Sequence, residues 1–323
     1  YSSYGFNVFS PYFVSPAVLI VGVLAGWYFR QGWRRGKRFE LVVVVLVVTV
    51  LVIPIYANAS AAVGGLFIAL AGLAARDLCD LRETRDQPLS TYQSSGSDVR
   101  LLGQAIVLAV TLGIGIWLVL DSQAAIVLTG VFAVVMVIGL WHPVGPPRWI
   151  PVVFGSLVAA MAGLAVMWLA SRASWPSWLA AGESLSSARH TLWSDALSLW
   201  ATQPLFGAGP GAFTPSSELA SSTPSLAAVH SLILQVGAEL GAIGVVLLAL
   251  VFVGGLVFAA RGSRPVALIA MAAWTALAVH ASIDHLEDFP IVGLMAGVIL
   301  GWSGFNAQLS EAACRPANTT GPE

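Results

Sequence analysis

The stretch His230-Ser-Leu-Ile-Leu-Gln-Val-Gly-Ala-Glu-Leu-Gly-Ala-Ile-Gly-Val-Val-Leu-Leu-Ala-Leu-Val-Phe-Val-Gly-Gly-Leu-Val-Phe-Ala-Ala260 contains a single charged residue, Glu239. A helix of about 20 apolar residues is long enough to cross the ~30 Å hydrocarbon core of a bilayer. This stretch is longer, so it predicts a membrane-spanning segment. An open strand cannot pair its backbone groups in lipid, and the segment is therefore expected to be helical.

The rest of the chain has the same character. Of its 323 residues, 57% are hydrophobic and 10% are charged, and the mean hydropathy is +0.83. Because a soluble domain carries about 25% charged residues, the bilayer is expected to be the solvent of this chain. Its apolar segments predict an all-α, polytopic transmembrane helix bundle with about nine spans, of which the first is interrupted early by Pro11 and Pro16. The predicted spans are 14–29, 39–55, 60–75, 101–120, 124–141, 150–170, 230–260, 265–282 and 289–305.

The basic residues predict how these spans are oriented. Cytoplasmic loops of membrane proteins carry an excess of Lys and Arg. With the spans above, thirteen of the fifteen Lys and Arg residues fall on one side, which we assign to the cytoplasm, and only Arg172 and Arg189 fall on the other. The N-terminus is therefore expected outside and the C-terminus in the cytoplasm.

This topology gives a predicted domain organisation with one long extracytoplasmic loop. The loop is rich in Trp and Phe, so it is expected to be partly helical, and Trp193, Leu197 and Trp200 recur at the spacing of an amphipathic helix that can lie at the membrane interface. The predicted parts are N-terminal transmembrane helices over 1–170 with a flexible cytoplasmic linker over 76–100, the loop over 171–229, C-terminal transmembrane helices over 230–308, and a cytoplasmic tail over 309–323.

Charge and cysteine content exclude several classes of function. The formal net charge of −1 argues against a nucleic-acid partner, which would require a basic patch. Cys79 and Cys314 both fall on the predicted cytoplasmic side, which argues against a disulfide framework or a cysteine metal cluster. The first residue is Tyr1, so an upstream segment could precede it.

Two residues at the predicted outer surface are the main candidates for chemistry. Arg189 is an exception to the charge bias, and its guanidinium could bind a phosphate through two parallel hydrogen bonds; alternatively, it is a solvated charge paired with Glu183 or Asp195. His230 opens the seventh predicted span, where a neutral imidazole can accept a proton from a hydroxyl. The alternative is a helix-start histidine that bonds only water or backbone.

Other polar residues leave their roles open. Glu239 lies about 13 Å deeper than His230 and on the opposite helix face, so it must face protein or be protonated, for a structural or a functional reason. Gly237, Gly241 and Gly244 form a small-residue stripe, which predicts the close approach of a neighbouring helix. The segment 207–211 is interpreted as a turn beside the site rather than as a phosphate-binding loop, because no strand precedes it.

The remaining candidates lie at predicted helix ends. Arg172 is placed where a helix meets the headgroups, and residues 121–123 form a tight outer turn. Residues 284–288 contain Asp284, His285, Glu287 and Asp288, which could bind a metal but are interpreted as a solvated acidic turn; His280 is assigned a structural role.

Several of these segments together resemble a known family. They are Arg189 followed by Leu192-Trp193 and Ala196-Leu197, then Pro204-Leu-Phe-Gly-Ala-Gly-Pro-Gly-Ala-Phe213, and then His230-Ser-Leu-Ile-Leu-Gln-Val-Gly-Ala-Glu-Leu-Gly-Ala-Ile-Gly244. This pattern resembles the O-antigen ligase and O-antigen polymerase superfamily. Asp121-Ser-Gln-Ala-Ala resembles the short outer turn of its members, and Ser282-Ile-Asp-His285 resembles the end of the family pattern.

The resemblance implies a GT-C-type glycosyltransferase of the bacterial cytoplasmic membrane. Such an enzyme moves a glycan from an undecaprenyl-diphosphate carrier to a glycan or lipid acceptor hydroxyl on the outer face, and no metal or other cofactor is expected. The resemblance implies that His230 is the catalytic histidine and that Arg189 binds the diphosphate. Possible supporting residues are Arg172, Glu239, Asp121, Ser122 and Gln123.

This chain departs from the family pattern in two ways. Gln123 stands where members often carry a second arginine, which leaves less positive charge for the diphosphate. About nine spans are predicted where about twelve are usual in the family, so N-terminal helices are missing or the protein is a short variant.

Ligase and polymerase activities are not distinguished by these residues, and a lipid-glycan flippase or transporter is the alternative from another class. A transporter is expected to place ionisable residues near the middle of the membrane in a discontinuous helix. The concentration of polar residues in one outer loop favours chemistry at the membrane surface.

Overall fold

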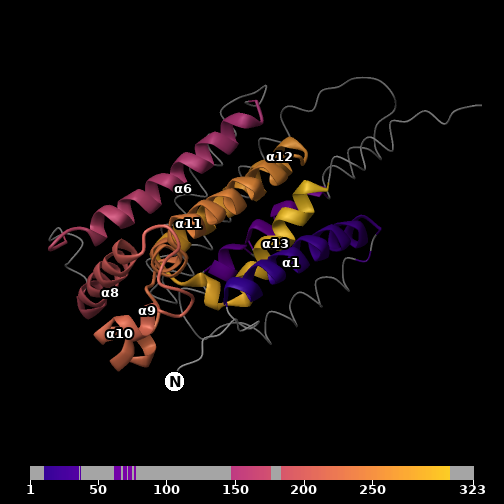
Figure 1. The fold of residues 1–323 in the computed structure, drawn as a ribbon. Helices are drawn as coiled ribbons and strands as arrows, with labels where there is room; N and C mark the ends of the chain where they lie inside the picture. Colours follow the sequence, from indigo (N-terminus) through magenta and orange to yellow (C-terminus); the bar gives the residue numbers. More distant parts are fainter. Residues whose placement is uncertain are drawn as a thin grey trace, which may run out of the picture.

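The computed structural model describes residues 11–35, 37, 62–66, 68–70, 72–74, 76–77, 147–175 and 183–305. Within these ranges every regular element is a helix and none is a strand (Figure 1). The long helices are α1 (Pro11–Arg34), α6 (Trp149–Ala170), α8 (Glu183–Thr202), α11 (Leu232–Ala259), α12 (Arg264–Ile283) and α13 (Pro290–Gly304). The predicted all-α class is confirmed for the part of the chain that is described.

Among the described residues, four helices are long and apolar enough to cross a membrane: Val14–Arg34, Trp149–Ala170, Leu232–Ala259 and Arg264–Ile283. Each lies within a few residues of a predicted span. The helix α1 begins at Pro11 and continues through Pro16, so these prolines do not interrupt it. The predicted spans 39–55, 101–120 and 124–141 lie outside the described residues, and the number of spans therefore stays a prediction.

The helix α12 is the centre of the bundle. It packs against α6, α11 and α13, and nearly all of its side chains are buried. Large apolar side chains of α1, α6 and α11 instead point outward, as suits contact with acyl chains. The helix α13 has 15 residues, about 22 Å at the helical rise, and is buried along most of its length.

Glycines bring α1 and α13 into close contact (Figure 1). A Cβ atom on Gly22 or Gly26 of α1 would collide with the backbone of α13, and one on Gly297 or Gly301 of α13 would collide with the backbone of α1. Small residues at four-residue spacing allow two helix backbones to approach in this way, and the gain in packing is what associates helices in lipid.

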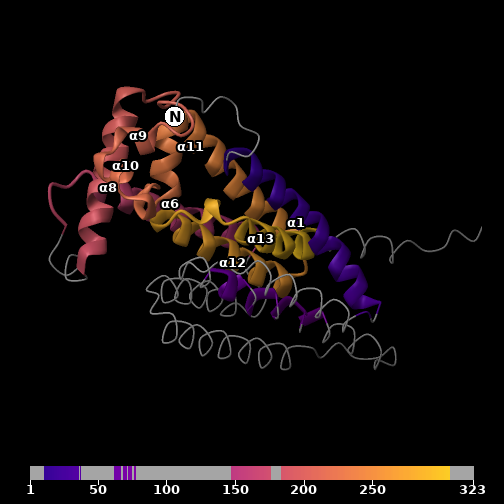
Figure 2. The ribbon, with the colours of Figure 1, turned by 90° about the horizontal axis from the view of Figure 1, so that it is seen from below.

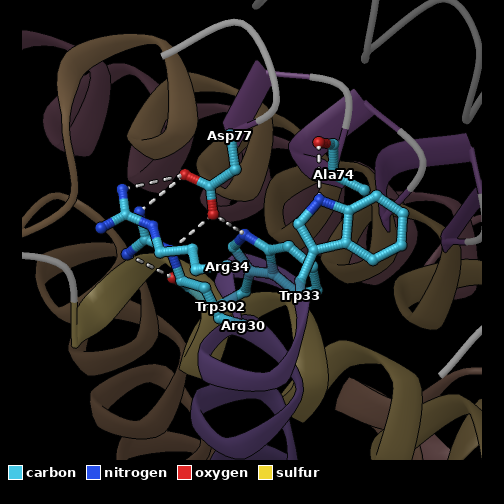
Figure 3. A network of polar contacts seen from close by, with 6 residues as sticks. All are labelled: Arg30, Trp33, Arg34, Ala74, Asp77 and Trp302. Atoms are coloured by element: carbon cyan, nitrogen blue, oxygen red, sulfur yellow. Dashed lines mark hydrogen bonds and ion pairs between the residues drawn. The ribbon is translucent and has the colours of Figure 1, made fainter. Parts of the chain in front are cut away.

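A buried ion pair joins three segments at the end of α1 (Figure 3). Arg30 donates two hydrogen bonds to Asp77, from Nε at 2.7 Å and from Nη2 at 2.8 Å, and its Nη1 bonds the carbonyl of Trp302. The Trp302 indole donates to the same carboxylate at 3.0 Å, and Arg34 approaches it at 3.5 Å. The predicted topology puts Arg30 in a loop and Asp77 at the start of a linker, yet their side chains are only 2% and 0% exposed.

The segment between α8 and α11 folds against the other end of the bundle (Figure 2). It contains α9 (Phe213–Ser216), α10 (Glu218–Ser222) and the 3₁₀ turn η1 (Pro224–Leu226). The predicted helix over 189–200 is confirmed as part of the longer helix α8. Of the predicted apolar face only Trp193 is buried, together with Leu192 and Ala196, whereas Leu197 and Trp200 are partly exposed. The expectation of a partly helical loop is therefore correct.

The helix α11 is broken at Gly241, which has φ 67° and ψ −164°. A straight helix would join the amides of Ala242 and Ile243 to the carbonyls of Ala238 and Glu239. At the break, these two amides instead donate to the carbonyls of Pro204 and Leu205, at 2.8 and 3.2 Å. The two carbonyls accept from the amides of Ala208 and Gly209, at 2.9 and 3.0 Å.

The loop over 203–209 thus replaces each hydrogen bond that these four backbone groups lose, which a break inside a membrane requires. The glycine stripe therefore allows two close approaches, one of the helix α8 and one of the loop. A Cβ on Gly237 would meet the Trp200 ring of α8, whereas one on Gly241 would collide with the Leu205 carbonyl of the loop.

We predict that Gly241→Ala destabilises the protein. The new methyl group would collide with Leu205, and φ 67° is in the region that L-residues disfavour, at a cost of about 1–3 kcal/mol for the backbone alone. The thermal midpoint of the detergent-purified protein should fall. Gly254→Ala is the matched control, because a Cβ there meets no atom within 4 Å; an unchanged midpoint for Gly241→Ala would contradict the role of the break.

The ion pair of α1 gives a second prediction. Asp77→Leu leaves the Arg30 charge buried without its partner and should destabilise the protein by about 3–5 kcal/mol. The double variant Arg30→Met, Asp77→Leu removes both charges and should recover most of that loss. Thermal midpoints of both single variants and of the double variant, measured in one detergent, test the pair; additive losses would contradict it.

Candidate functional site

Three side chains meet where α12 ends and α11 begins. Asp284 follows the last residue of α12, His285 is next in the chain, and His230 directly precedes Ser231, the N-cap of α11. The helices α11 and α12 are consecutive and pack together, so His230 and Asp284 lie at the same end of the bundle although 54 positions separate them.

The Asp284 carboxylate binds both imidazoles. Its Oδ1 atom lies 3.3 Å from Nδ1 of His230 and 2.8 Å from Nδ1 of His285, and it accepts a bond from the His285 amide at 2.9 Å. The two rings meet edge to face with their centroids 4.2 Å apart. The Asp284 side chain is 1% exposed and the His230 side chain 8%, so the cluster is shielded from water.

The charge of Asp284 determines what His230 can do. Burial alone would raise the pKa of Asp284, but the hydrogen bonds from the rings of His230 and His285 outweigh burial and hold that pKa well below its usual range. An ionised carboxylate only accepts hydrogen bonds. The proton of a neutral His230 ring therefore belongs on Nδ1, and the Nε2 lone pair is left as a base. Nε2 is buried and has no hydrogen-bond partner among the described residues.

The backbone of His230 is held in an uncommon conformation. Its φ of 56° is the only positive value for a non-glycine residue in the described chain. Such a residue persists when its surroundings hold it, and it is a recognised feature of functional sites. Here the indole of Trp193 donates to the His230 carbonyl at 3.3 Å, and the side chain of Gln235 accepts from the Val229 amide at 3.0 Å. The Ser231 hydroxyl also caps α11 by accepting from the Leu234 amide.

Arg189 lies on α8, within electrostatic range of His280 of α12. Among the described side chains its guanidinium makes no hydrogen bond or ion pair. Asp195, one of the partners considered from sequence, instead accepts from Ser217 at 2.6 Å, and the side chain of Glu183, the other, lies outside the described residues. Arg189 and Asp284 are the charged groups that act on His280 of α12. No hydrogen bond or ion pair joins Arg189 to His230 among the described residues, so a site shared by these two side chains stays a prediction.

Glu239 has a structural position in the described chain. It is 2% exposed and accepts hydrogen bonds from the amides of Gly211 and Phe213, at 2.8 and 3.4 Å, and from the Gln235 side chain at 2.6 Å. These bonds satisfy the buried carboxylate that sequence analysis required to face protein. Through Gln235 the carboxylate also supports the turn that carries His230.

The glycine-rich segment 207–211 is a turn against α11, as predicted. Each amide from Gly207 to Phe213 donates within the protein: to Gln203, to the broken helix, to Glu239 or to Gly209. An anion-binding loop needs amides that are free to point at the ligand. This segment has none in the ligand-free chain, so the phosphate-binding alternative is not supported.

The other supporting candidates contribute less or are not described. Arg172 is exposed, with its guanidinium 4.4 Å from the centroid of the Trp168 ring, and its carbonyl lies 2.7 Å from Nε2 of His190. Arg172 therefore lies just beyond the end of α6, as predicted from its place in the sequence. Asp121, Ser122 and Gln123 lie outside the described residues.

The interpretation of residues 284–288 as a solvated acidic turn is wrong for Asp284, which is buried between two histidines. Burial also raises the pKa of Glu287 well above its ordinary value, with the carboxylates of Asp288 and Asp284 acting in the same direction. Ser15 of α1 donates to the Glu287 carbonyl at 2.9 Å, so the start of α1 covers this side of the site.

The alternative of a metal site has a geometric basis. One ligand atom each from His230, Asp284 and His285 lie within 4.8 Å of one another. In the present arrangement, both Nδ1 atoms are turned toward the same carboxylate oxygen. An ion held by these Nδ1 atoms and the carboxylate would have to replace those hydrogen bonds.

Comparison with known proteins finds one family match. The family model described as O-antigen ligase matches residues 107–249, which contain Arg189, the glycine-rich turn and His230. No curated protein and no solved structure matches the chain. The family match supports placing the chain in the O-antigen ligase and O-antigen polymerase superfamily.

Proposed function

We propose that the chain is a GT-C-type membrane glycosyltransferase that acts like an O-antigen ligase. It moves a glycan from an undecaprenyl-diphosphate carrier to an acceptor hydroxyl on the outer face of the bacterial cytoplasmic membrane. The observation that carries this proposal is the state of His230, whose Nδ1 is bonded to a buried carboxylate while its Nε2 is unpartnered. The family match supports a lipid-linked glycan as the class of substrate.

His230 is the proposed catalytic base. As the bond from the sugar to the acceptor oxygen forms, the acceptor hydroxyl must lose its proton, and Nε2 accepts it. General-base catalysis of this kind contributes about 10²–10⁴-fold to the rate. Asp284 is the proposed positioning residue, because it holds the proton on Nδ1 and stabilises the imidazolium that forms.

Arg189 is the proposed ligand of the diphosphate. The leaving diphosphate gains negative charge in the transition state, and a fixed cation beside it lowers the barrier. A guanidinium that is half-buried and unpaired within the described chain can meet a phosphate without breaking an existing ion pair. Its attraction for the phosphate is stronger in a partly dry pocket than in water.

The remaining elements of the proposal concern topology and partners. We place the site on the outer side, with the N-terminus outside and the C-terminus cytoplasmic, and the isoprenoid tail of the carrier between helices. Glu239 supports the His230 turn, whereas Arg172 and the turn formed by Asp121, Ser122 and Gln123 are weaker candidates. A polymerase of the same superfamily would use the same residues with a different acceptor.

A flippase or transporter is the alternative, and the break in α11 is the observation that favours it. Discontinuous helices are common in transporters, where the half-helix ends bind the substrate. Here the four backbone groups freed at Gly241 are paired with residues 204–209, and Glu239 is bonded to Gly211, Phe213 and Gln235. The polar groups at the break are therefore bonded to a loop of the protein itself and are not left to bind a transported substrate. This favours the glycosyltransferase over the transporter.

We predict that His230→Ala and Arg189→Ala each abolish glycan transfer while the protein still inserts. Purified variants in nanodiscs would be incubated with a lipid-diphosphate glycan and candidate acceptors, and released carrier diphosphate would be measured. His190→Ala and Arg261→Ala are matched controls: His190 bonds the Arg172 carbonyl, and Arg261 lies over the Phe258 ring near the far end of α11. Both controls should remain active.

The same variants distinguish the enzyme from the flippase in cells. Loss of transfer should leave carrier-linked glycan on the outer face of the membrane. Accumulation on the cytoplasmic face would overturn the glycosyltransferase proposal in favour of the flippase.

Asp284→Asn gives an independent prediction. The amide matches the carboxylate in size but does not stabilise a positively charged His230, and it can reverse the ring's tautomer. We expect the turnover number to fall by about 10²-fold or more, with little change in the KM for the donor. Steady-state kinetics with varied donor would test this, and an unchanged turnover number would exclude the positioning role.

A further inference from the structure

Buried polar atoms without partners gather around Asp284. Among the described residues they include Nε2 of His230, Oε2 of Glu287 and both ring nitrogens of His280. A buried donor or acceptor that makes no hydrogen bond costs free energy, and native proteins contain few of them. A group of such atoms in one place therefore indicates a ligand that supplies the missing bonds.

His280 is the most unusual member of this group. Its side chain is 0% exposed, and neither ring nitrogen makes a hydrogen bond within the described chain. The ring therefore lacks the hydrogen bond that would offset the cost of burying a polar side chain here. The position is close to the site along the chain. His280 lies in the last turn of α12, four residues before Asp284, which caps that helix.

The depth and charge of the position suit a phosphorylated headgroup. His280 lies three residues before the end of α12, about 5 Å along the helix, so it is near the membrane surface. It lies within electrostatic range of both Asp284 and Arg189. Arg189 is half-buried and makes no ion pair within the described chain, so it can adjust to a bound anion.

We infer that His280 is a second ligand of the carrier diphosphate, which it binds together with Arg189. This inference rests on the proposed function and names a residue that recognises the diphosphate group. A diphosphate diester carries two negative charges near neutral pH, and Arg189 supplies one positive charge. An imidazole N–H of His280 donates to a phosphate oxygen and gives the ring the partner that it lacks in the ligand-free chain.

Binding of two lipids tests the inference directly. Undecaprenyl diphosphate and undecaprenyl monophosphate would be titrated into the full chain in nanodiscs, and their dissociation constants compared. In His280→Phe, which keeps a ring but removes both nitrogens, affinity for the diphosphate should fall about 10-fold, as expected for a hydrogen bond to a charged group. Affinity for the monophosphate should change much less. Equal losses for the two lipids, or no loss, would overturn the inference.

Two further variants separate recognition from folding. Thr275→Val is the matched control, because Thr275 is also a fully buried, unpartnered polar residue of α12 but faces Gly155 of α6. It should bind both lipids as the wild type does. His280→Gln retains an N–H donor and should recover part of the diphosphate preference; it decides the question if His280→Phe does not fold. A glutamine variant no better than phenylalanine would count against a hydrogen bond from position 280.

Kinetics separate this inference from the proposed function. If the wild type transfers glycan but His280→Phe and His280→Gln leave the donor KM unchanged, the role of His280 is wrong and the enzyme proposal stands. If the wild type prefers the diphosphate lipid through His280 but transfers no glycan, the binding site stands and the glycosyltransferase proposal is wrong. For a correct inference, the donor KM should rise about 10-fold and the acceptor KM should not change.

Discussion

The hydrogen bonds between the broken helix α11 and the loop before it are the constraint on which the site depends. Lipid offers no partner to the backbone groups released at Gly241, so the protein must supply them, and residues 204–209 do so. This contact fixes the loop at a depth of about 13 Å below the start of α11. Glu239 then ties the same loop to Gln235, one turn below the segment that carries His230. The turn that carries His230 is thus linked to the break in α11 through Gln235 and Glu239, while Trp193 bonds the His230 carbonyl.

The spans could be predicted from sequence because a single property determines them. A bilayer requires about 20 apolar residues per span, and α6 and α12 end within a residue or two of the predicted limits. The break in α11 could not be found in this way, because hydropathy does not change across Gly241. Its glycine stripe was interpreted as helix packing, and only the position of the loop shows that one of those glycines adopts a positive φ. Arg30 was misplaced for a related reason: a charge at a span end resembles a loop charge until its buried partner, Asp77, is located.

The candidate site was predicted in part. Arg189 and His230 were chosen for their place in the topology and for a family resemblance that the match over 107–249 supports. Asp284 was missed as the partner of His230, because a sequence pattern carries no information about contacts across 54 positions. One signal was present. Two consecutive antiparallel spans return the chain to the same membrane surface, so a residue just before the first span and one just after the second are candidates for contact.

That geometry also explains why a buried charge is tolerated at the site. A carboxylate in lipid is costly, but Asp284 lies at a helix end, shielded from water and bonded to two imidazoles and an amide. Because these bonds keep it ionised, it holds the protons of both rings on Nδ1 and directs the basic nitrogen of His230 away from itself. In the proposed mechanism, the charge of Asp284 therefore leaves His230 with a basic nitrogen that faces neither water nor the carboxylate. A base in that environment is suited to a hydroxyl that a bound acceptor brings to it, while water outside the shielded cluster is a poor competitor.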